Sequence, residues 1–425
     1  MPVMMVCGLQ WGDEAKGKIT HLLADSTDYV ARFAGGPNSG HTIVTGNKTI
    51  KLHVVPAGIM KHDSINLMGS GMVVDPDGLM QELEDISMVT DYKGRLFISE
   101  GSHMILKYHR YQEELDEKSR GKSSIGTSMR GIGPCYADKI NRIGIRMGLL
   151  RDEPRLRKIL ARNLEKKNTI FERLYDSKPL TFDEVYEPVE RAISAIGSML
   201  ADTSRIAHDA LSEGKDILLE GNQGILLDLE HGTYPYVTSS SCLPVSGMST
   251  FGLSPKHLRR ITGVVKAYQT RVGKGPFPTK LDDDVGQMIR ERGNEYGTTT
   301  GRPRDCGWLD LVALRYAVRI SGATDLALTL IDVLDTFDEI KVCTEYKISG
   351  KTVRHFNPDS GYLAHVEPIY KRFEGWMKNL SDYQQIDDLP DKTKEYIGFI
   401  EDYVGVPINI VSVGPGEKRT AWRRP

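Results

Sequence analysis

The chain has 425 residues, of which 40% are hydrophobic and 26% are charged, so it can bury a large core in one elaborated α/β domain or in two smaller ones. A formal net charge of -2 and a pI near 6.6 provide no general electrostatic field for holding nucleic acid or an anionic membrane. No apolar run approaches the roughly 20 residues of a membrane span, and the five cysteines lack CxxC pairs and zinc-ligand spacing, so we expect a cytoplasmic protein with free thiols.

Short apolar runs alternate with helical periodicities along the chain, which predicts an α/β fold with a mainly parallel sheet and flanking helices. The expected strands are 3–7, 65–68, 217–220, 261–267, 326–333 and 408–413. Apolar residues at helical spacing predict amphipathic helices over 156–174 and 189–200. No repeat or Pro/Ser-rich linker divides the sequence, so we expect a single domain over 1–425 with helical insertions around 100–215.

Four long stretches lack a clear period and are rich in Gly, Thr, Ser and Arg. They cover residues 34–46, 119–142, 231–254 and 272–308. Loops of this length inside a compact protein are usually functional or disordered. Their sharp glycine punctuation favours function.

The stretch GDEAKGKI follows the first apolar run and nearly matches a phosphate-binding loop. Gly12, Gly17 and Lys18 occupy the expected positions, but Ile19 replaces the Ser or Thr whose hydroxyl would hold Mg²⁺. A strand, a glycine-rich turn and a helix start would place backbone N–H groups around an anion, and Lys16 and Lys18 would add positive charge. The loop therefore predicts a phosphoryl-transfer site whose metal ligand lies elsewhere.

Two acidic residues in the same turn, Asp13 and Glu14, allow two interpretations. They would repel phosphate unless a cation intervened, and Mg²⁺ bridged by Asp13 and phosphate oxygens would remove the conflict. Alternatively, both residues cap the N-terminus of the following helix, which would stabilise it by roughly 0.5–2 kcal/mol. The turn alone does not separate these interpretations.

A second loop, GGPNSGHT, combines three glycines with the amide of Asn38 and the imidazole of His41. Glycines allow the backbone to approach a ligand closely. Together the two loops supply an acid, two lysines and a histidine. Such a set suits the stabilisation of charge on a phosphoryl group during transfer.

At this point the residues resemble a known family, the adenylosuccinate synthetases. The shared segments, in the same order and at similar spacing, are GLQWGDEAKGK, GGPNSGHT, GTSMRGIGPCYADK, EGNQGILLDLEHGTYPYVTSS, TRVGKGPFPT, YGTTTGRPRDCGWLD and SVGPG. They run from about residue 3 to residue 416. The resemblance implies a P-loop-related fold, a homodimer, and the GTP-driven joining of inosine monophosphate (IMP) to L-aspartate with release of GDP and phosphate.

The resemblance also implies a mechanism. Asp13 removes the N1 proton of the purine, so that O6 attacks the γ-phosphorus of GTP, and the amino group of aspartate then displaces phosphate from C6. His41, Lys16 and Gln223 complete the implied catalytic set. Mg²⁺ is expected on Asp13, the carbonyl of Gly40 and phosphate oxygens, which accounts for Ile19 in the first loop.

Binding residues carry over from the family by position. The IMP-binding residues would be Asp13, Asn38, Ser128, Arg142, Gln223, Thr238 and Arg302, with Arg142 reaching the site of the partner subunit. The aspartate-binding residues would be Thr298, Thr299, Thr300 and Arg302. The donor-nucleotide-binding residues would be Gly12, Gly17, Lys18, Gly40, His41, Thr42, Arg304, Asp332, Ser412 and Gly414.

Several positions depart from the family pattern, and they concern substrate choice. Leu330 stands where a lysine typically lies near the guanine ring, which would cost roughly 1.5–3 kcal/mol of donor preference. Pro37 replaces a His or Asn, Ser128 replaces a Thr, and Asp305 stands at a position that is often basic. After the shared YVTSS, the run SCLPVSGMS differs from the family's usual sequence.

Three alternatives to the family's usual reaction follow from these departures or from the motifs themselves. A phage relative of the family makes 2-amino-deoxyadenylosuccinate from dGMP and can use ATP; Leu330 and Pro37 lean towards it, whereas Asp13 favours IMP. A P-loop switch protein would need a Ser or Thr after Lys18 and an Asn/Thr-Lys-x-Asp motif, and the sequence has neither. A paralogue that binds nucleotides without turnover is disfavoured because His41 and the other implied catalytic residues are retained.

Overall fold

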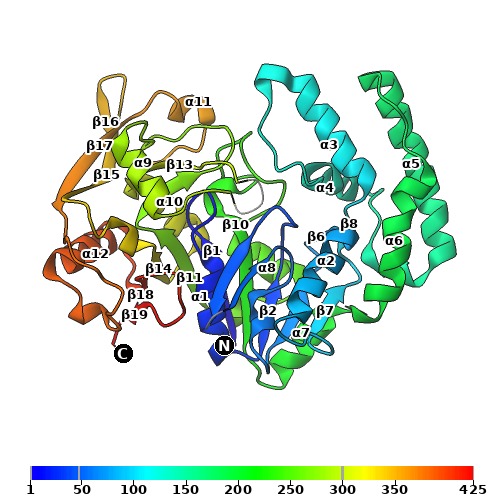
Figure 1. The fold of residues 1–425 in the computed structure, drawn as a ribbon, viewed down its shortest axis with the longest axis horizontal. Coiled ribbons are helices and arrows are strands. Elements are labelled where there is room, and N and C mark those ends of the chain that lie inside the picture. Colours follow the sequence, from blue (N-terminus) through cyan, green and yellow to red (C-terminus); the bar gives the residue numbers. More distant parts are fainter. Residues whose placement is uncertain (1, 46–47, 298–300, 425) are drawn as a thin grey trace.

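The computed structural model describes residues 2–45, 48–297 and 301–424, and within them ten strands form the main sheet (Figure 1). From one edge to the other the strands are β19 (Thr420–Trp422), β18 (Ile408–Ser412), β14 (Asp325–Thr329), β11 (Leu258–Lys266), β1 (Val3–Gly8), β10 (Ile217–Gly224), β2 (Tyr29–Arg32), β5 (Ile65–Met68), β7 (Leu96–Ser99) and β9 (Leu200–Ala201). All neighbouring pairs are parallel except β18 and β19. The predicted α/β class with a large, mainly parallel sheet is confirmed.

Strand β1 lies in the middle of this sheet and is buried on both faces. Val3 and Met5 pack in an apolar cluster with residues of α7 (Thr203–Ser212) and α8 (Pro244–Thr250). Val6 packs in a separate cluster with Ile19 of α1 (Lys16–Leu23). A parallel strand covered by helices on both faces reads as a continuous apolar run. This is why the first apolar run of the sequence predicts the element correctly.

The carboxyl ends of the parallel strands meet at one edge of the main sheet. The glycine-rich turn follows β1 there, the loop that leads to β3 (His41–Thr45) follows β2, and β10, β11, β14 and β18 end at the same edge. From β1 the chain continues through α1 to strands on one side, while β11 lies on the other. Ligands of open α/β sheets bind outside the carboxyl ends of the strands at such a switch point.

A second, smaller sheet lies beyond one end of the main sheet (Figure 1). It contains β12 (Tyr268–Arg271), β13 (Asp305–Asp310), β15 (Glu339–Ile348), β16 (Lys351–Val353) and β17 (Glu367–Glu374). Helix α10 (Leu311–Ser321) packs against β15, and α12 (Asp391–Val404) packs against β17 and α10. The same part of the molecule carries α9 (Asp284–Arg292) and α11 (Ser360–Leu363).

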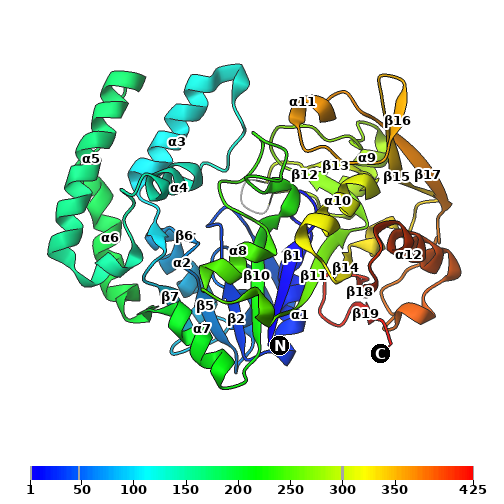
Figure 2. The ribbon, with the colours of Figure 1, turned by 180° about the vertical axis from the view of Figure 1, so that it is seen from behind.

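Most of the remaining helices form a group at the opposite end of the molecule (Figures 1 and 2). They are α2 (Pro76–Ser87), α3 (Lys107–Arg120), α4 (Ile132–Ile140), α5 (Glu153–Tyr175) and α6 (Phe182–Ile196). Two small two-stranded sheets accompany them, β3 with β4 (Lys48–Leu52) and β6 (Val73–Val74) with β8 (His103–Met104). Helix α5 matches the helix predicted over 156–174. Helix α6 begins seven residues before the helix predicted over 189–200 and ends at Ile196, because a 3-10 turn covers Gly197–Met199 and Leu200 belongs to β9. Among the described residues, no helix combines the length and apolar character needed to cross a bilayer.

The strand predicted over 326–333 ends earlier than expected. Strand β14 stops at Thr329, Leu330 has a left-handed backbone with φ 55°, and a 3-10 turn covers Ile331–Leu334. Apolar residues continue past the end of the strand because Ile331 and Leu334 pack in the core below the second sheet. The prediction was wrong there because a continuous apolar run does not show where a buried strand becomes a buried turn.

The long unperiodic stretches also contain regular structure that the sequence pattern did not reveal. Helix α4 lies within 119–142, α8 within 231–254, and α9 and part of β13 within 272–308. Helix α8 has seven residues and the other two have nine each. Helices of two turns or so are too short to establish a 3.6-residue period between polar loops.

Candidate active site

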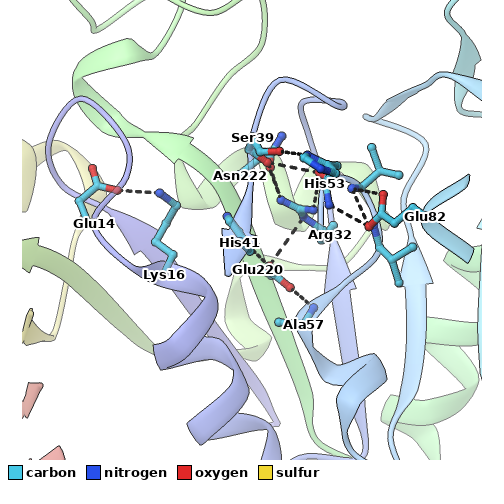
Figure 3. Close-up of polar contacts among 12 residues, drawn as sticks. Glu14, Lys16, Arg32, Ser39, His41, His53, Ala57, Glu82, Glu220 and Asn222 are labelled. Carbon is cyan, nitrogen blue, oxygen red and sulfur yellow. Dashed lines mark hydrogen bonds and ion pairs between the residues drawn. The ribbon is translucent and has the colours of Figure 1, made fainter. Parts of the chain in front are cut away.

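Glu14 fills the turn between β1 and α1. Its Oε1 accepts hydrogen bonds from the backbone N–H groups of Gln10 (3.0 Å) and Gly12 (2.9 Å), and its Oε2 pairs with Nζ of Lys16 at 2.6 Å (Figure 3). Burial would raise the pKa of Glu14, but Lys16 and backbone hydrogen bonds, including that from Gly12, bring it below the ordinary value. Helix α1 begins after Ala15 with no side-chain cap. The capping interpretation is therefore not supported, and Glu14 acts as an internal anion in a turn built to hold one.

Asp13 lies on the outer side of the same turn. Its backbone is left-handed (φ 60°), its side chain is 32% exposed, and its Oδ2 lies 3.1 Å from Nε of Arg304. Left-handed backbones are uncommon in residues other than glycine and concentrate at functional sites. The turn therefore presents the Asp13 carboxylate where a ligand can reach it, with a guanidinium beside it.

His41 begins β3 and lies between α1 and β10 (Figure 3). Its Nδ1 donates a hydrogen bond to Oε1 of Glu220, whose Oε2 accepts one from the backbone N–H of Ala57 at 2.7 Å. Nε of Arg32 lies 3.8 Å from the same carboxylate. Burial and Arg32 lower the pKa of His41, although Glu220 opposes the shift. Nε2 of His41 has no hydrogen-bond partner in the part of the chain that the structure describes.

Two of the predicted IMP-binding residues, Asn38 and Gln223, are in direct contact. Nε2 of Gln223 donates a hydrogen bond to Oδ1 of Asn38 at 3.0 Å. The two chain segments approach so closely that a Cβ on Gly35 would lie 2.0 Å from Nδ2 of Asn222, and Gly35 has a φ of 76°. Only glycine meets both conditions without strain in the backbone and displacement of the Asn222 side chain.

Lys18 connects α1 to the C-terminal loop. Its Nζ donates hydrogen bonds of 2.8 Å to Oγ of Ser412 and to the carbonyl oxygens of Gly414 and Arg419. Burial lowers the pKa of Lys18 to about 8. Three predicted donor-nucleotide residues thus lie together, but the ammonium of Lys18 is directed at the C-terminal loop and away from the anion position of the first turn.

The end of β14 also reaches the first turn. Oγ1 of Thr329 donates a hydrogen bond of 2.9 Å to the carbonyl oxygen of Glu14. Leu330 packs against the apolar cluster of the second sheet. Burial raises the pKa of Asp332, whereas Lys18 and Arg292 act in the opposite direction. The segment with Leu330 and Asp332, which is expected to lie near the guanine ring, is therefore coupled through the hydrogen bond of Thr329 to the turn that holds Asp13.

Other predicted site residues lie further out. Ser128 and Arg142 are exposed at the two ends of α4, and Arg142 has a left-handed backbone with φ 60°. Arg302 is exposed, and its carbonyl accepts a hydrogen bond from Gly297 at 2.8 Å. Thr238 is half-buried, and its Oγ1 has no partner among the described residues. Gly40 and Thr42 flank His41, while Thr298, Thr299 and Thr300 lie outside the described residues.

Several charged residues at the site were missed by the sequence interpretation. Glu220 accepts a hydrogen bond from His41 and pairs with Arg32. Glu295 pairs with both Arg304 and Lys266. All four are buried. A signal for three of them was present in the sequence, since LLEGNQ, VARF and VVKAY each place one charge within or at the end of an apolar strand run. A charge in such a position is rarely buried unless it is paired.

The residues present are compatible with a sparse magnesium site. Within the described residues, no group of three or more His, Cys, Asp or Glu side chains is arranged to hold a metal ion. Mg²⁺ usually keeps several waters and binds through one or two carboxylates together with substrate phosphates. The accessible carboxylate of Asp13 suits a site of that kind.

Comparisons with known proteins agree with this geometry. Residues 5–421 match the family model of adenylosuccinate synthetase. Adenylosuccinate synthetases from Caldanaerobacter subterraneus and Desulforamulus reducens are 47% and 44% identical to this chain; each match covers 99% of this chain and 99% or 98% of the relative. The structure of fully ligated adenylosuccinate synthetase from Plasmodium falciparum superposes with a TM-score of 0.95 at 36% identity and covers 100% of both chains.

A more distant solved structure is that of the succinoaminodeoxyadenylate synthetase of cyanophage S-2L bound to dGMP and dATP. It has a TM-score of 0.62 and 18% identity, and the match covers 99% of this chain and 95% of that one. At this identity the likeness shows a shared fold alone.

Proposed function

The chain belongs to the adenylosuccinate synthetase family, a family of GTP-dependent ligases of purine biosynthesis that join L-aspartate to C6 of IMP, and from this premise we propose how its residues perform the reaction. The observation that carries the proposal is that Asp13, His41 and the Asn38–Gln223 pair all lie on segments at the carboxyl ends of the main-sheet strands, in a chain that matches the family over nearly its whole length. The oxygen at purine C6 is a poor leaving group, so the site must first convert it into a phosphate ester.

In the first step Asp13 accepts the N1 proton of IMP, and negative charge builds on O6. O6 then attacks the γ-phosphorus of GTP, the bond from that phosphorus to the β–γ bridging oxygen breaks, and GDP leaves. A general base of this kind contributes about 10²–10⁴ in rate. The accessible carboxylate of Asp13 on a left-handed turn supports the assignment.

Charge on the transferred phosphoryl group is balanced by His41 and Lys16. Because Nδ1 of His41 donates to Glu220, Nε2 can donate a hydrogen bond only when the ring carries both protons. Glu220 stabilises that charged form, and approaching phosphoryl oxygens would favour it further. Lys16 is held by Glu14, which fixes its ammonium within the turn where the phosphates would bind.

In the second step the amino group of L-aspartate attacks C6. The C6–O6 bond breaks, phosphate leaves, and the amine loses its proton to give adenylosuccinate. Arg302 and the threonines at 298–300 would bind the two carboxylates, since guanidinium groups pair with carboxylates in a bidentate manner. Mg²⁺, held by Asp13 and the carbonyl of Gly40, would supply charge neutralisation at the phosphates.

The remaining assignments concern organisation and location. Arg142 is exposed at the end of α4, which suits its proposed reach into the site of a partner subunit in a homodimer. Five buried cysteines without disulfides support a cytoplasmic location. The main sheet contains strands from both ends of the sequence, which supports a single domain with helical insertions around 100–215.

IMP and GTP are the substrates expected from the family, and the dGMP-dependent reaction is the competing possibility. A phosphate-release assay with purified protein tests both. Release should require GTP, IMP and L-aspartate together, with formation of adenylosuccinate. Product from dGMP in place of IMP would overturn the choice of substrate, and release that does not depend on aspartate would overturn the ligase assignment.

A further inference from the structure

Behind Asp13 lies a buried chain of charges that the mechanism above does not use. Nε of Arg304 lies 3.1 Å from Oδ2 of Asp13 in an ion pair without hydrogen-bond geometry, and Nη1 of Arg304 donates to Oε2 of Glu295 at 2.5 Å. Oε1 of Glu295 accepts hydrogen bonds from Nζ of Lys266 (2.7 Å) and from the hydroxyl of Tyr268 (2.6 Å). Charges of opposite sign alternate from the buried lysine to the accessible carboxylate.

Glu295 is held firmly at its place in this chain. Its side chain is 1% exposed and that of Lys266 is 0% exposed. Burial would raise the pKa of Glu295, but Lys266 and Arg304 bring it below its ordinary value, so the group remains ionised. Lys266 ends β11 and Tyr268 begins β12, which places two of the partners of Glu295 on sheet strands. The carboxylate is therefore a rigid support for Arg304.

Glu295 also joins the two ends of the proposed aspartate-binding loop. We call the residues at these ends, Glu295 and Arg304, the neck of the loop. The backbone N–H of Arg304 donates to the carbonyl oxygen of Glu295 at 2.9 Å, so the two residues are joined by a backbone contact and by their side chains. Between them, Gly297 donates to the carbonyl of Arg302 at 2.8 Å. The loop that would bind L-aspartate thus starts at Glu295 and ends at Arg304, and Arg304 contacts Asp13.

We propose that Glu295 is a positioning residue for the ligase reaction: by holding Arg304, it fixes the Asp13 carboxylate and the neck of the aspartate loop relative to each other. The guanidinium is planar, so the bond from Nη1 to Glu295 sets the direction in which Nε meets Asp13. Without the Glu295 charge, Arg304 can rotate towards solvent or towards the phosphates, and Asp13 loses its fixed neighbour. The inference rests on the proposed role of Asp13.

Positional isotope exchange in GTP, measured with IMP and without aspartate, reads the phosphoryl step separately from the amino acid. Glu295→Gln keeps the size of the side chain and removes its charge. We expect it to slow the exchange and kcat by a similar factor of about 10–100. Asp325→Asn is the matched control, since Asp325 is a buried carboxylate that pairs with Arg260 at the amino end of β14, away from the carboxyl ends of the strands where the site lies. Its exchange rate should remain that of the wild type.

A double-mutant cycle separates positioning through Arg304 from general stabilisation. If Glu295 acts through Arg304, then Glu295→Gln should change the exchange rate by no more than about twofold in an Arg304→Lys background. Multiplicative losses in the double variant would overturn the proposal. Tyr268→Phe removes one hydrogen bond to Glu295 and leaves every charge, and it should slow exchange about two- to fivefold. This variant keeps the test decisive if Glu295→Gln does not fold, because a wild-type rate would then contradict the proposal.

Asp13→Asn in the same experiment separates the role of Glu295 from the proposed role of Asp13. Loss of exchange in Asp13→Asn together with a wild-type rate in Glu295→Gln would remove the role of Glu295 alone. Undiminished exchange in Asp13→Asn would remove the proposed mechanism itself, whatever Glu295→Gln shows.

Discussion

Replacing Gly17 with alanine tests the placement of His41 against α1. A Cβ at position 17 would lie 2.7 Å from Cβ and 3.2 Å from Cα of His41. Carbon atoms pack at about 3.5 Å or more, so α1 or β3 must move by about 0.8 Å, because neither atom of His41 is at the end of a flexible side chain. A misplacement of about 1 Å can cost about 10²-fold in rate. We therefore expect kcat to fall about 10- to 100-fold.

The stability of the variant should change much less than its activity. Alanine is favoured over glycine by about 1 kcal/mol in a helix, while overpacking typically costs about 1–3 kcal/mol. The two effects partly cancel. Gly398→Ala is the matched control, because Gly398 lies within α12 and a Cβ there has no neighbour within 4 Å. It should stabilise the protein by about 0.5–1 kcal/mol and leave activity unchanged.

Both variants should be compared by urea unfolding and by steady-state phosphate release with GTP, IMP and aspartate. We expect Gly398→Ala to gain stability at full activity and Gly17→Ala to lose activity at nearly unchanged stability. A Gly17→Ala enzyme as active as Gly398→Ala would show that the contact between α1 and His41 does not position the ring for catalysis.

Three further variants or conditions test other parts of the site and core. Burial lowers the pKa of Lys18 to about 8, so raising the pH through 8 removes one of the three N–H groups that hold the C-terminal loop with Ser412 and Gly414. The Kd for GDP, measured by calorimetry, should therefore rise several-fold between pH 7 and 9. A Kd that does not change with pH would refute the idea that Lys18 holds this loop for nucleotide binding. Burial raises the pKa of Asp310 to about 6, so the folded state binds its proton more tightly and the free energy of unfolding falls as pH rises from about 4 to 6. The free energy of unfolding of Asp310→Asn relative to the wild type should therefore rise on the order of 1 kcal/mol from pH 5 to pH 7.5, as measured by urea unfolding at both pH values. The same relative stability at both pH values would count against the raised pKa of Asp310. Asp332 is expected to accept hydrogen bonds from N1 and N2 of guanine, so Asp332→Asn should cost roughly 1.5–3 kcal/mol and raise the KM for GTP about 10- to 150-fold without affecting any use of ATP. Equal losses with both nucleotides would contradict a role in reading guanine.

The fold was predictable because its central strands are buried on both faces. Strand 65–68 matches the structure, and the strands expected at 3–7, 217–220, 261–267 and 408–413 lie within three residues of the observed bounds at their starts and within four at their ends. Strand ends were less predictable. β10 runs on through Gly224 because its polar residues continue to pair beside β1, and β14 stops at Thr329 because Leu330 turns into the core.

The candidate site was predictable in its outer members and not in its supports. The sequence placed Asp13 and His41 in glycine-rich loops, where motif and spacing are informative. Glu220 could not be assigned in this way, since it acts on a residue distant in sequence. Glu295 lies only nine positions from Arg304, but it stands just outside the shared segment that begins at Tyr296. Only the folded sheet brings Glu220 to His41, 179 positions apart. For Lys18 the motif was misleading in the other direction. Its position in the motif predicts a contact with phosphate, whereas its three hydrogen bonds go to the C-terminal loop.

The central claim is that the carboxylate of Asp13 activates the purine for phosphorylation. The most direct measurement is the rate of adenylosuccinate formation by Asp13→Asn at saturating GTP, IMP and L-aspartate, with nucleotide binding checked by calorimetry. The account predicts a fall of about 10²–10⁴-fold, or roughly 3–5 kcal/mol, with the variant still folded and still binding IMP. Formation of product at the wild-type rate would contradict it.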